Sequence, residues 1–242
     1  MFQAAAPAKP GRHKKTPPLF AFDLDGTITR EEMLPRLAAR LGLEREISLL
    51  TAKTLSGEIP FEASFRKRFS MLRRLPLSII HEEVLAIGLD RHIEAFIRRR
   101  REDCVIVTGN LDRWIQPLVE PLGCMVRCSL SRPAAEGGDP AGPEGLELAA
   151  VLDKGEATRE LKSLGRPLVA VGESVSDLPM FREADLGLAF AGVHSPAKEL
   201  LARADRLFDC GRNLCAFLEE LASNAAMSDC LQGGASEIKQ AR

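Results

Sequence analysis

Apolar positions along the chain follow two patterns, short continuous runs and stripes with helical spacing. Short runs rich in Val, Ile, Leu and Phe are typical of strands that are buried on both faces of a parallel sheet. The sequence predicts such strands at 19–22, 104–107, 125–130, 146–152, 168–171 and 186–190. Apolar residues with helical spacing lie between and after the later strands. We expect these helices at 93–101, 113–122, 155–164, 177–183, 196–204 and 213–222.

The segment after the first strand has helical spacing only. It predicts four helices, at 33–41, 46–55, 61–75 and 78–86. We therefore expect a helical insertion over 31–90 in an α/β core made of 19–30 and 91–222. Strands that alternate with helices imply a parallel sheet with helices on both faces. Residues 1–18 and 223–242 lack this patterning and predict a disordered N-terminal tail and a flexible C-terminal tail.

Two carboxylates follow the first predicted strand, and ligands bind beyond the carboxyl ends of strands in such sheets. Asp23 and Asp25 start on the same side of the chain because strand side chains alternate. Like charges this close are costly unless a cation or a substrate uses them. The pair suits a metal-binding site that attacks phosphorus, with Asp23 as nucleophile and Asp25 as general acid/base. A solvated turn is the alternative, since Asp-Gly is a common turn pair.

Polar groups follow two further apolar runs. Thr108 comes after the strand at 104–107 and precedes Gly109 and Asn110, so a hydroxyl and main-chain amides there can hold phosphate oxygens. Lys154 lies where the helix at 155–164 begins, and its ammonium can neutralise both the nucleophile and the phosphoryl group. Taken alone, Thr108 is better explained as a turn threonine and Lys154 as a surface lysine.

Two more acids follow the strand at 168–171. Glu173 and Asp177 are natural Mg²⁺ ligands or supports for such ligands, although acids are also common at the start of a helix. Four unrelated turns, surface residues and helix starts do not explain well why each polar group follows an apolar strand in this order.

Composition excludes several classes of partner. The chain has 242 residues, 45% hydrophobic and 28% charged, and a formal net charge of −1, so no overall field favours nucleic acid or a membrane surface. It has one tryptophan and no tyrosine, which argues against a base-stacking platform. No stretch predicts a membrane span or a secretory signal, and the six cysteines form no CxxC pair. We expect a cytoplasmic protein, a monomer or a homodimer, with no nucleic-acid or membrane partner.

Over residues 19–220 the chain resembles the haloacid dehalogenase superfamily, and within it the phosphoserine phosphatase-like group. The residues that match the four motifs are Asp23 with Asp25, Thr108, Lys154, and Glu173 with Asp177. The resemblance implies a Rossmann-like core with a helical cap inserted after the first motif. It also implies one Mg²⁺, bound by the Asp23 carboxylate, the Asp25 main-chain carbonyl and Glu173, the first acid of the last motif.

The predicted cap extends the resemblance. Glu32 stands where phosphoserine phosphatases keep a glutamate, and residues 57–68 are similar to their G-x-x-x-F-E-x-S-L-x-x-R-V segment. By this similarity Glu32 receives the substrate ammonium, Arg68 pairs with its carboxylate, and Phe61 shields the site. An amino acid is a zwitterion and needs one acid and one base in a closed pocket. The alternative is that Glu32 and Arg68 form surface ion pairs.

Four positions depart from the family pattern. Glu173 replaces an aspartate, Asn110 a second glycine, Ser176 an asparagine, and Leu55 a methionine. The extra methylene of Glu173 must be absorbed, since a misplacement of about 1 Å can cost about 10²-fold in rate. These changes bear on the substrate more than on the class of reaction. We count Gly109, Asn110 and Ser176 among the residues expected to bind substrate.

The sequence favours a Mg²⁺-dependent phosphomonoesterase that works through an aspartyl-phosphate, with phosphoserine as the expected substrate. A phosphatase or phosphotransferase for another small phosphate ester is one alternative. A non-catalytic protein that binds a phosphorylated ligand is the other, because Glu173 and Asn110 depart from the pattern.

Overall fold

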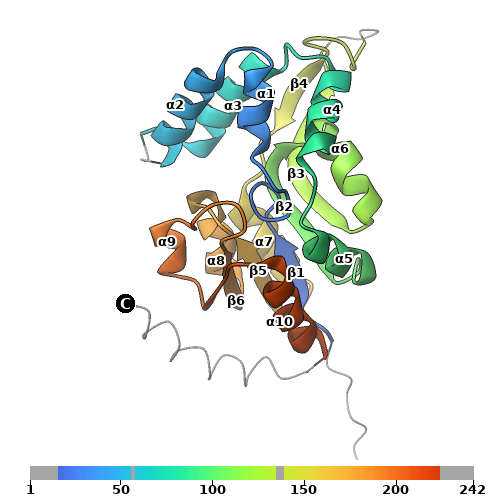
Figure 1. Ribbon diagram of the computed structural model, residues 1–242, viewed down its shortest axis with the longest axis vertical. Coiled ribbons are helices and arrows are strands. Elements are labelled where there is room, and N and C mark those ends of the chain that lie inside the picture. Colours follow the sequence, from blue (N-terminus) through green and yellow to red (C-terminus); the bar gives the residue numbers. More distant parts are fainter. Residues whose placement is uncertain (1–15, 56–57, 135–138, 224–242) are drawn as a thin grey trace, which may run out of the picture.

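The computed structural model describes residues 16–55, 58–134 and 139–223. Most of the two predicted tails, and Gly57 of the predicted cap, therefore lie outside the described residues. The fold is built on a seven-stranded sheet with the order β4-β3-β2-β1-β5-β6-β7 (Figure 1). The strands are β1 (Leu19–Phe22), β2 (Cys104–Leu111), β3 (Met125–Pro133), β4 (Leu146–Ala150), β5 (Leu168–Gly172), β6 (Leu186–Phe190) and β7 (Arg206–Phe208). The predicted α/β class is confirmed.

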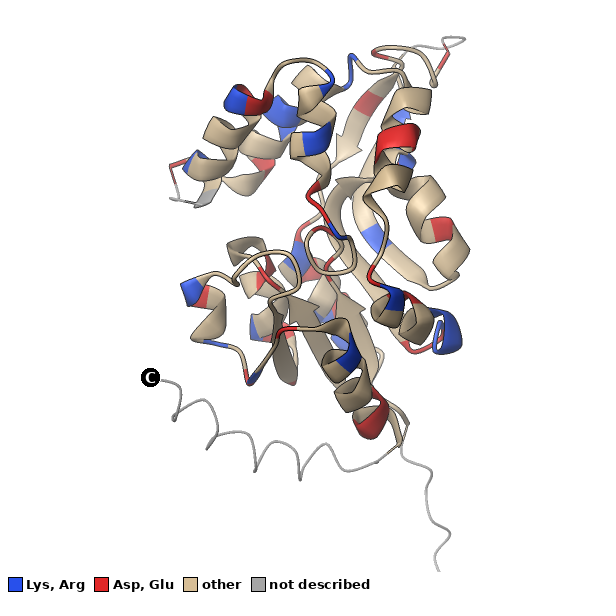
Figure 2. Cartoon of the chain, viewed as in Figure 1, with Lys and Arg blue, Asp and Glu red and all other residues tan. Residues whose placement is uncertain are grey.

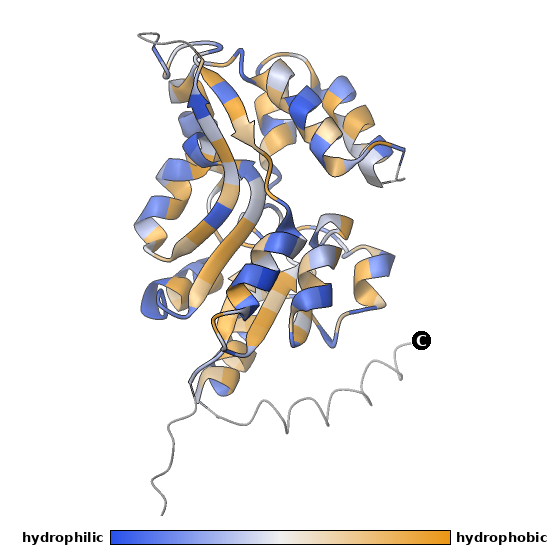
Figure 3. Ribbon diagram, turned by 180° about the vertical axis from the view of Figure 1, so that it is seen from behind, coloured by the Kyte–Doolittle hydropathy of each residue, from blue (hydrophilic) through white to orange (hydrophobic). Residues whose placement is uncertain are grey.

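The central strand β1 is buried on both faces, as its apolar run predicts. Phe20 and Phe22 pack into one apolar cluster, whereas Leu19 and Ala21 pack into a second cluster on the other face. Residues of α5 (Arg91–Arg99), α6 (Asp112–Val119) and α10 (Gly211–Ser223) complete the first cluster. Residues of α7 (Lys154–Lys162), α8 (Leu178–Glu183) and α9 (Lys198–Leu201) complete the second. Apolar strands thus lie between two helical layers (Figure 3).

Three features of the sheet differ from the sequence prediction. Strand β4 pairs antiparallel with β3, because the two are joined as a hairpin by one loop and no helix crosses over between them. The strand predicted at 104–107 continues to Leu111, so Thr108 to Asn110 lie inside β2 and not in a turn. Strand β7 was not predicted, since three residues are too few to show a period.

Four helices separate β1 from α5, and the described part of the segment holds no strand between them. They are α1 (Met33–Ala39), α2 (Glu44–Leu55), α3 (Phe61–Leu72) and α4 (Leu77–Ile87). Figure 1 shows α1–α3 beyond the carboxyl ends of the strands. The Phe69 ring of α3 stacks on Trp114 of α6 with centroids 5.6 Å apart, and His81 of α4 contacts the Arg113 carbonyl at 2.7 Å. The helices are therefore anchored on the core; a separate cap domain remains a prediction.

No helix in the described ranges combines the length and the apolar character that crossing a membrane requires.

A buried charge joins two of these helices. Glu83 of α4 has a side chain that is only 7% exposed, and it accepts hydrogen bonds from Arg36 at 2.6 Å and from Arg40, both on α1. The hydrogen bond from Arg40 is the main reason why the pKa of Glu83 lies below its ordinary value of 4.5. This carboxylate therefore holds α1 against α4 in its ionised form.

We predict that Glu83→Gln lowers the free energy of unfolding by about 1–2 kcal/mol at neutral pH, since charged hydrogen bonds are lost. Because the folded pKa is depressed, this contribution is complete above pH 4.5 and disappears as pH falls through the folded pKa. The difference between wild type and variant should therefore shrink below about pH 4.5 in urea denaturation curves. Glu82→Gln is the control, because Glu82 is 65% exposed. Equal effects of the two substitutions would contradict the assignment.

Candidate active site

The residues predicted to carry the chemistry meet at the carboxyl ends of the central strands. Asp23 follows β1, Thr108 lies near the end of β2, and Glu173 follows β5. Lys154 begins α7, and Asp177 ends the short 3-10 turn Val175–Asp177 that precedes α8. All five side chains are buried, although four of them are ionisable. Figure 2 shows acidic residues in red on the segments that meet between α1–α3 and the sheet.

Lys154 is the centre of this cluster. Its Nζ donates to Asp23 Oδ1 at 2.5 Å and to Asp177 Oδ1 at 2.6 Å. Burial alone would lower the pKa of Lys154, but the charges of Asp177 and Asp23 outweigh it and hold the pKa above its usual value. The ammonium is therefore charged at neutral pH and fixes the distance between β1 and the β5 loop.

Asp177 supports the main chain around it with its second oxygen. Oδ2 accepts hydrogen bonds from Glu173 N at 3.0 Å, from Ser174 N at 2.9 Å and from Ser174 Oγ at 3.2 Å. With Lys154 on Oδ1, both oxygens of Asp177 are occupied. Asp177 thus shapes the loop that presents Glu173. It supports Glu173, an expected metal ligand, and holds Lys154 through its other oxygen.

Negative charge in the site exceeds positive charge. Burial raises the pKa of Asp23, and the charge of Asp177 raises it further. Burial followed by the charge of Glu32 does the same for Asp25. Burial and the charge of Asp23 raise the pKa of Glu173 to about 8. A bound divalent cation would offset these raised pKa values, because it favours the ionised form of each carboxylate.

The donor set fits a hard divalent cation. The candidate ligands offer only oxygen atoms, which are the donors that such a cation takes. No three His, Cys, Asp or Glu side chains among the described residues are arranged to hold a metal by themselves. The expected set uses two side chains, Asp23 and Glu173, and one main-chain carbonyl. Mg²⁺ commonly takes one or two carboxylates and completes its shell with water and phosphate oxygens.

The longer side chain of Glu173 is accommodated by Gly26. Gly26 has φ +72°, and a Cβ built on it would lie 2.8 Å from Glu173 Cδ. The carboxyl group of Glu173 therefore lies where any other residue at position 26 would place its side chain. The turn glycine thus has two functions: it allows a left-handed turn and it makes room for the extra methylene.

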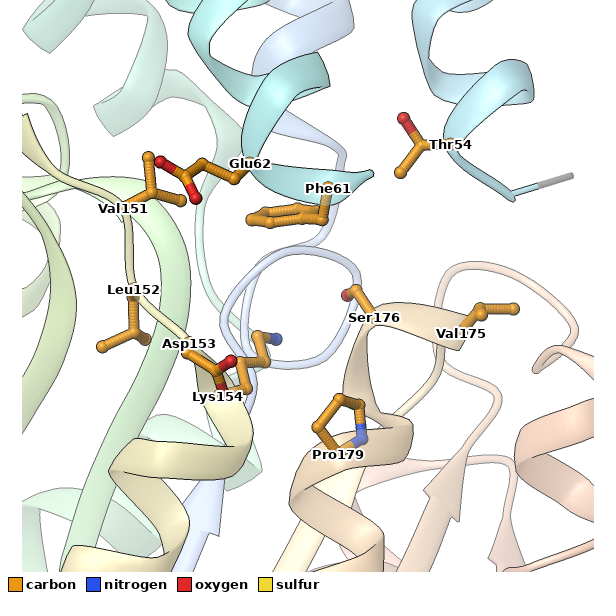
Figure 4. Close-up of a pocket in the computed structure, with 10 residues that line it drawn as sticks. All are labelled: Thr54, Phe61, Glu62, Val151, Leu152, Asp153, Lys154, Val175, Ser176 and Pro179. Carbon is orange, nitrogen blue, oxygen red and sulfur yellow. The ribbon is translucent and has the colours of Figure 1, made fainter. Parts of the chain in front are cut away.

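A cavity of about 400 Å³ lies between this cluster and helices α2 and α3 (Figure 4). Phe61, the first residue of α3, lies across it, with Lys154 and Ser176 on the core side. A Cβ on Gly109 would lie 2.6 Å from Phe61 Cζ, so the phenyl ring is packed against the bare glycine. Ser176 Oγ is 2.7 Å from Ser174 Oγ, which keeps its hydroxyl on its own loop.

Glu32 and Arg68 approach the cluster from the helical segment. Arg68 is 7% exposed, forms no ion pair in the described part of the chain, and contacts the Ser64 carbonyl at 3.5 Å. Burial lowers the pKa of Arg68, whereas the charges of Glu32 and Asp25 raise it. Glu32 is not paired with Arg68 either, and His194 lies 4.0 Å from it. The two charges thus lie within electrostatic reach but do not neutralise each other by direct contact.

One residue of the site carries no signal in the sequence. Ser129 of β3 is fully buried; its Oγ donates to the Gly109 carbonyl at 2.7 Å and accepts from Leu152 N at 3.1 Å. It connects the end of β2 to the loop that leads into Lys154. A lone serine in a strand looks like any polar position, and only the fold reveals this bridge.

A family model, haloacid dehalogenase-like hydrolase, matches residues 20–182. The chain belongs to this family. A phosphoserine phosphatase of Methanocaldococcus jannaschii is 28% identical over 73% of this chain and 87% of that protein. Phosphoserine phosphatase SerB2 of Mycobacterium tuberculosis is 30% identical over 73% of the chain, which spans only 44% of that relative. The family member described here is a phosphatase-type hydrolase.

Solved structures agree with this membership. A phospho-aspartyl intermediate analogue of phosphoserine phosphatase aligns with a TM-score of 0.68 and 26% identity, covering 84% of this chain and 99% of that one. A substrate-bound phosphoserine phosphatase complex aligns with a TM-score of 0.68 and 25% identity, covering 85% and 99%.

We predict that Gly26→Ala lowers phosphatase activity by about 100-fold, because the methyl group displaces the Glu173 carboxyl group. Gly42→Ala is the matched control: Gly42 has φ +65° and nothing within 4 Å of its Cβ position. Both variants should lose about 1 kcal/mol of stability to backbone strain, but Gly42→Ala should keep near-wild-type activity. Hydrolysis of p-nitrophenyl phosphate and thermal unfolding measure the two effects. Full activity of Gly26→Ala would show that the position of Glu173 is unimportant.

Proposed function

We propose that the protein hydrolyses O-phospho-L-serine to serine and phosphate in a Mg²⁺-dependent reaction through an aspartyl-phosphate. The observation that carries the proposal is the placement of Glu32 and Arg68. Two opposite charges, one of them almost fully buried, lie near the acid cluster without pairing with each other. An unpaired buried guanidinium is costly unless a ligand completes it.

The chemistry of phosphoserine fits these two charges. Its ammonium needs a carboxylate, its carboxylate needs a cation that can bind it through two hydrogen bonds, and Arg68 is such a cation. The Phe61 ring lies 5.9 Å from the Arg68 guanidinium and covers Gly109, so it can exclude water once substrate is bound. The curated relatives and the solved structures named phosphoserine phosphatase support the same substrate.

In the first step an oxygen of Asp23 forms a bond to phosphorus while the bond from phosphorus to the serine oxygen breaks. Asp25 donates its proton to the departing alkoxide. Burial and the charge of Glu32 raise the pKa of Asp25, which favours the protonated form that this step needs. Lys154 keeps the Asp23 carboxylate in place and offsets the charge of the transferring group.

In the second step Asp25, now ionised, takes a proton from water as the water oxygen attacks phosphorus. The bond from phosphorus to Asp23 breaks, which releases phosphate and restores both carboxyl groups. Thr108 and the Gly109 amide lie at the end of β2, where they can donate to phosphoryl oxygens.

The residues that would hold Mg²⁺ are Asp23 and Glu173 through their carboxylates and Asp25 through its main-chain carbonyl. When bound, the ion withdraws negative charge from the phosphoryl oxygens. Asp177 keeps Lys154 and the loop at 173–174 in position for this arrangement.

We predict Mg²⁺-dependent phosphate release from phosphoserine, abolished by EDTA and by Asp23→Asn. Phosphoethanolamine lacks the carboxylate and phosphoglycerate lacks the ammonium, so each should have a kcat/KM on the order of 10- to 100-fold lower than phosphoserine. If the protein hydrolyses other esters but not phosphoserine, the proposed phosphatase activity stands and the proposed substrate is wrong. Binding without turnover of any ester would support the non-catalytic alternative.

Two variants separate the roles of the charges. Arg68→Gln should weaken the reaction of phosphoserine and phosphoglycerate and spare phosphoethanolamine. Glu32→Gln should weaken the reaction of phosphoserine and phosphoethanolamine more than that of phosphoglycerate. A uniform loss across the three esters would contradict the assignment of either residue.

A further inference from the structure

Asn110 lies near the end of β2 and is 5% exposed. A second glycine is usual at this position in the phosphatases that the chain resembles. Its Nδ2 donates a hydrogen bond to Asp25 Oδ2 at 2.9 Å. The other oxygen, Asp25 Oδ1, is buried and accepts no hydrogen bond from the described residues. The two oxygens of Asp25 therefore differ, because only Oδ2 is held by Asn110.

The same residue also sets the hydroxyl of Thr108. The main-chain N–H of Asn110 donates to Thr108 Oγ1 at 3.2 Å, and Asn110 Nδ2 lies 3.4 Å from the same oxygen. Because Thr108 Oγ1 accepts these contacts, the proton of its own hydroxyl is available for another acceptor. A glycine would retain the main-chain hydrogen bond and lose both side-chain contacts.

Asn110 is itself rigidly placed. Strand β2 pairs with β1, and Asn110 near the end of β2 reaches the turn after β1 that carries Asp25. Ser129 Oγ fixes the carbonyl of Gly109, the residue before Asn110. Hydrogen bonds from such a preorganised group orient a carboxyl group without a further cost in side-chain entropy.

We propose that Asn110 is a positioning residue for Asp25, which it holds through Oδ2 so that Oδ1 is the atom that exchanges protons with the leaving group and with water. The inference rests on the proposed function, in which Asp25 is the acid/base. In the first step the proton on Oδ1 passes to the serine oxygen as its bond to phosphorus breaks. In the second step Oδ1 takes a proton from the attacking water. The amide keeps both of its protons throughout.

The dependence of the rate on the leaving group tests this role. A serine alkoxide needs a proton as it leaves, whereas p-nitrophenolate is stable without one. Asn110→Gly removes the amide, and Asn110→Leu keeps comparable bulk without a donor. Both should lower kcat/KM for phosphoserine on the order of 10-fold or more and lower kcat/KM for p-nitrophenyl phosphate much less, because kcat/KM reports the first step, in which only the serine alkoxide needs a proton. Thermal unfolding confirms that each variant is folded.

A double-mutant cycle with Asp25→Asn shows whether Asn110 acts through Asp25. In the Asp25→Asn background, Asn110→Gly should have no further effect on either ester. Equal losses on both esters, or a gain in activity from relieved crowding, would overturn the inference.

Asp25→Asn alone separates this inference from the mechanism beneath it. If that variant loses no more kcat/KM on phosphoserine than on p-nitrophenyl phosphate, the role of Asp25 as acid in the first step fails and the inference fails with it. If Asp25→Asn is selective and Asn110→Gly is not, only the role of Asn110 is overturned. Should phosphoserine not be a substrate, the alkyl phosphate that wild type hydrolyses best replaces it.

Discussion

The ammonium of Lys154 between Asp23 and Asp177 is the contact on which the rest of the site depends. It joins the end of β1, the start of α7 and the loop after β5, three segments that are distant in sequence. A buried charge is tolerated only with well-placed partners, and here each partner is itself fixed by the sheet or by main-chain hydrogen bonds. The arrangement therefore sets the position of the Asp23 carboxylate before any substrate arrives.

A second constraint is the surplus of carboxylates that Lys154 leaves uncompensated. Asp25 and Glu173 remain near Asp23, and Glu32 approaches from the helical segment. Their mutual repulsion in a buried site is reduced when a divalent cation and a cationic substrate group are bound. The cavity of about 400 Å³ borders the cluster at Lys154, where such ligands would have room to bind.

Much of the site could be predicted from the sequence because buried strands have a strong signal. Asp23, Thr108 and Glu173 each come at or near the end of an apolar run, and parallel strands bring such ends to one edge. Contacts that depend on side-chain direction could not be predicted. The fit of Glu173 over Gly26 and the hydrogen bond from Asn110 to Asp25 arise from turn geometry and strand register, which composition and periodicity do not encode. Strand β4 was predicted, but its antiparallel direction was not, because an apolar run does not reveal the direction of a strand.

Direct trapping of the phosphorylated enzyme is the measurement that tests the account most directly. The protein would be mixed with phosphoserine labelled in its phosphate, quenched in acid within a single turnover, and digested for mass spectrometry. The account predicts a labile acyl-phosphate on the peptide that contains Asp23, and none in Asp23→Asn. Release of phosphate without a labelled enzyme, or a label on another residue, would contradict the assignment of Asp23 as the nucleophile.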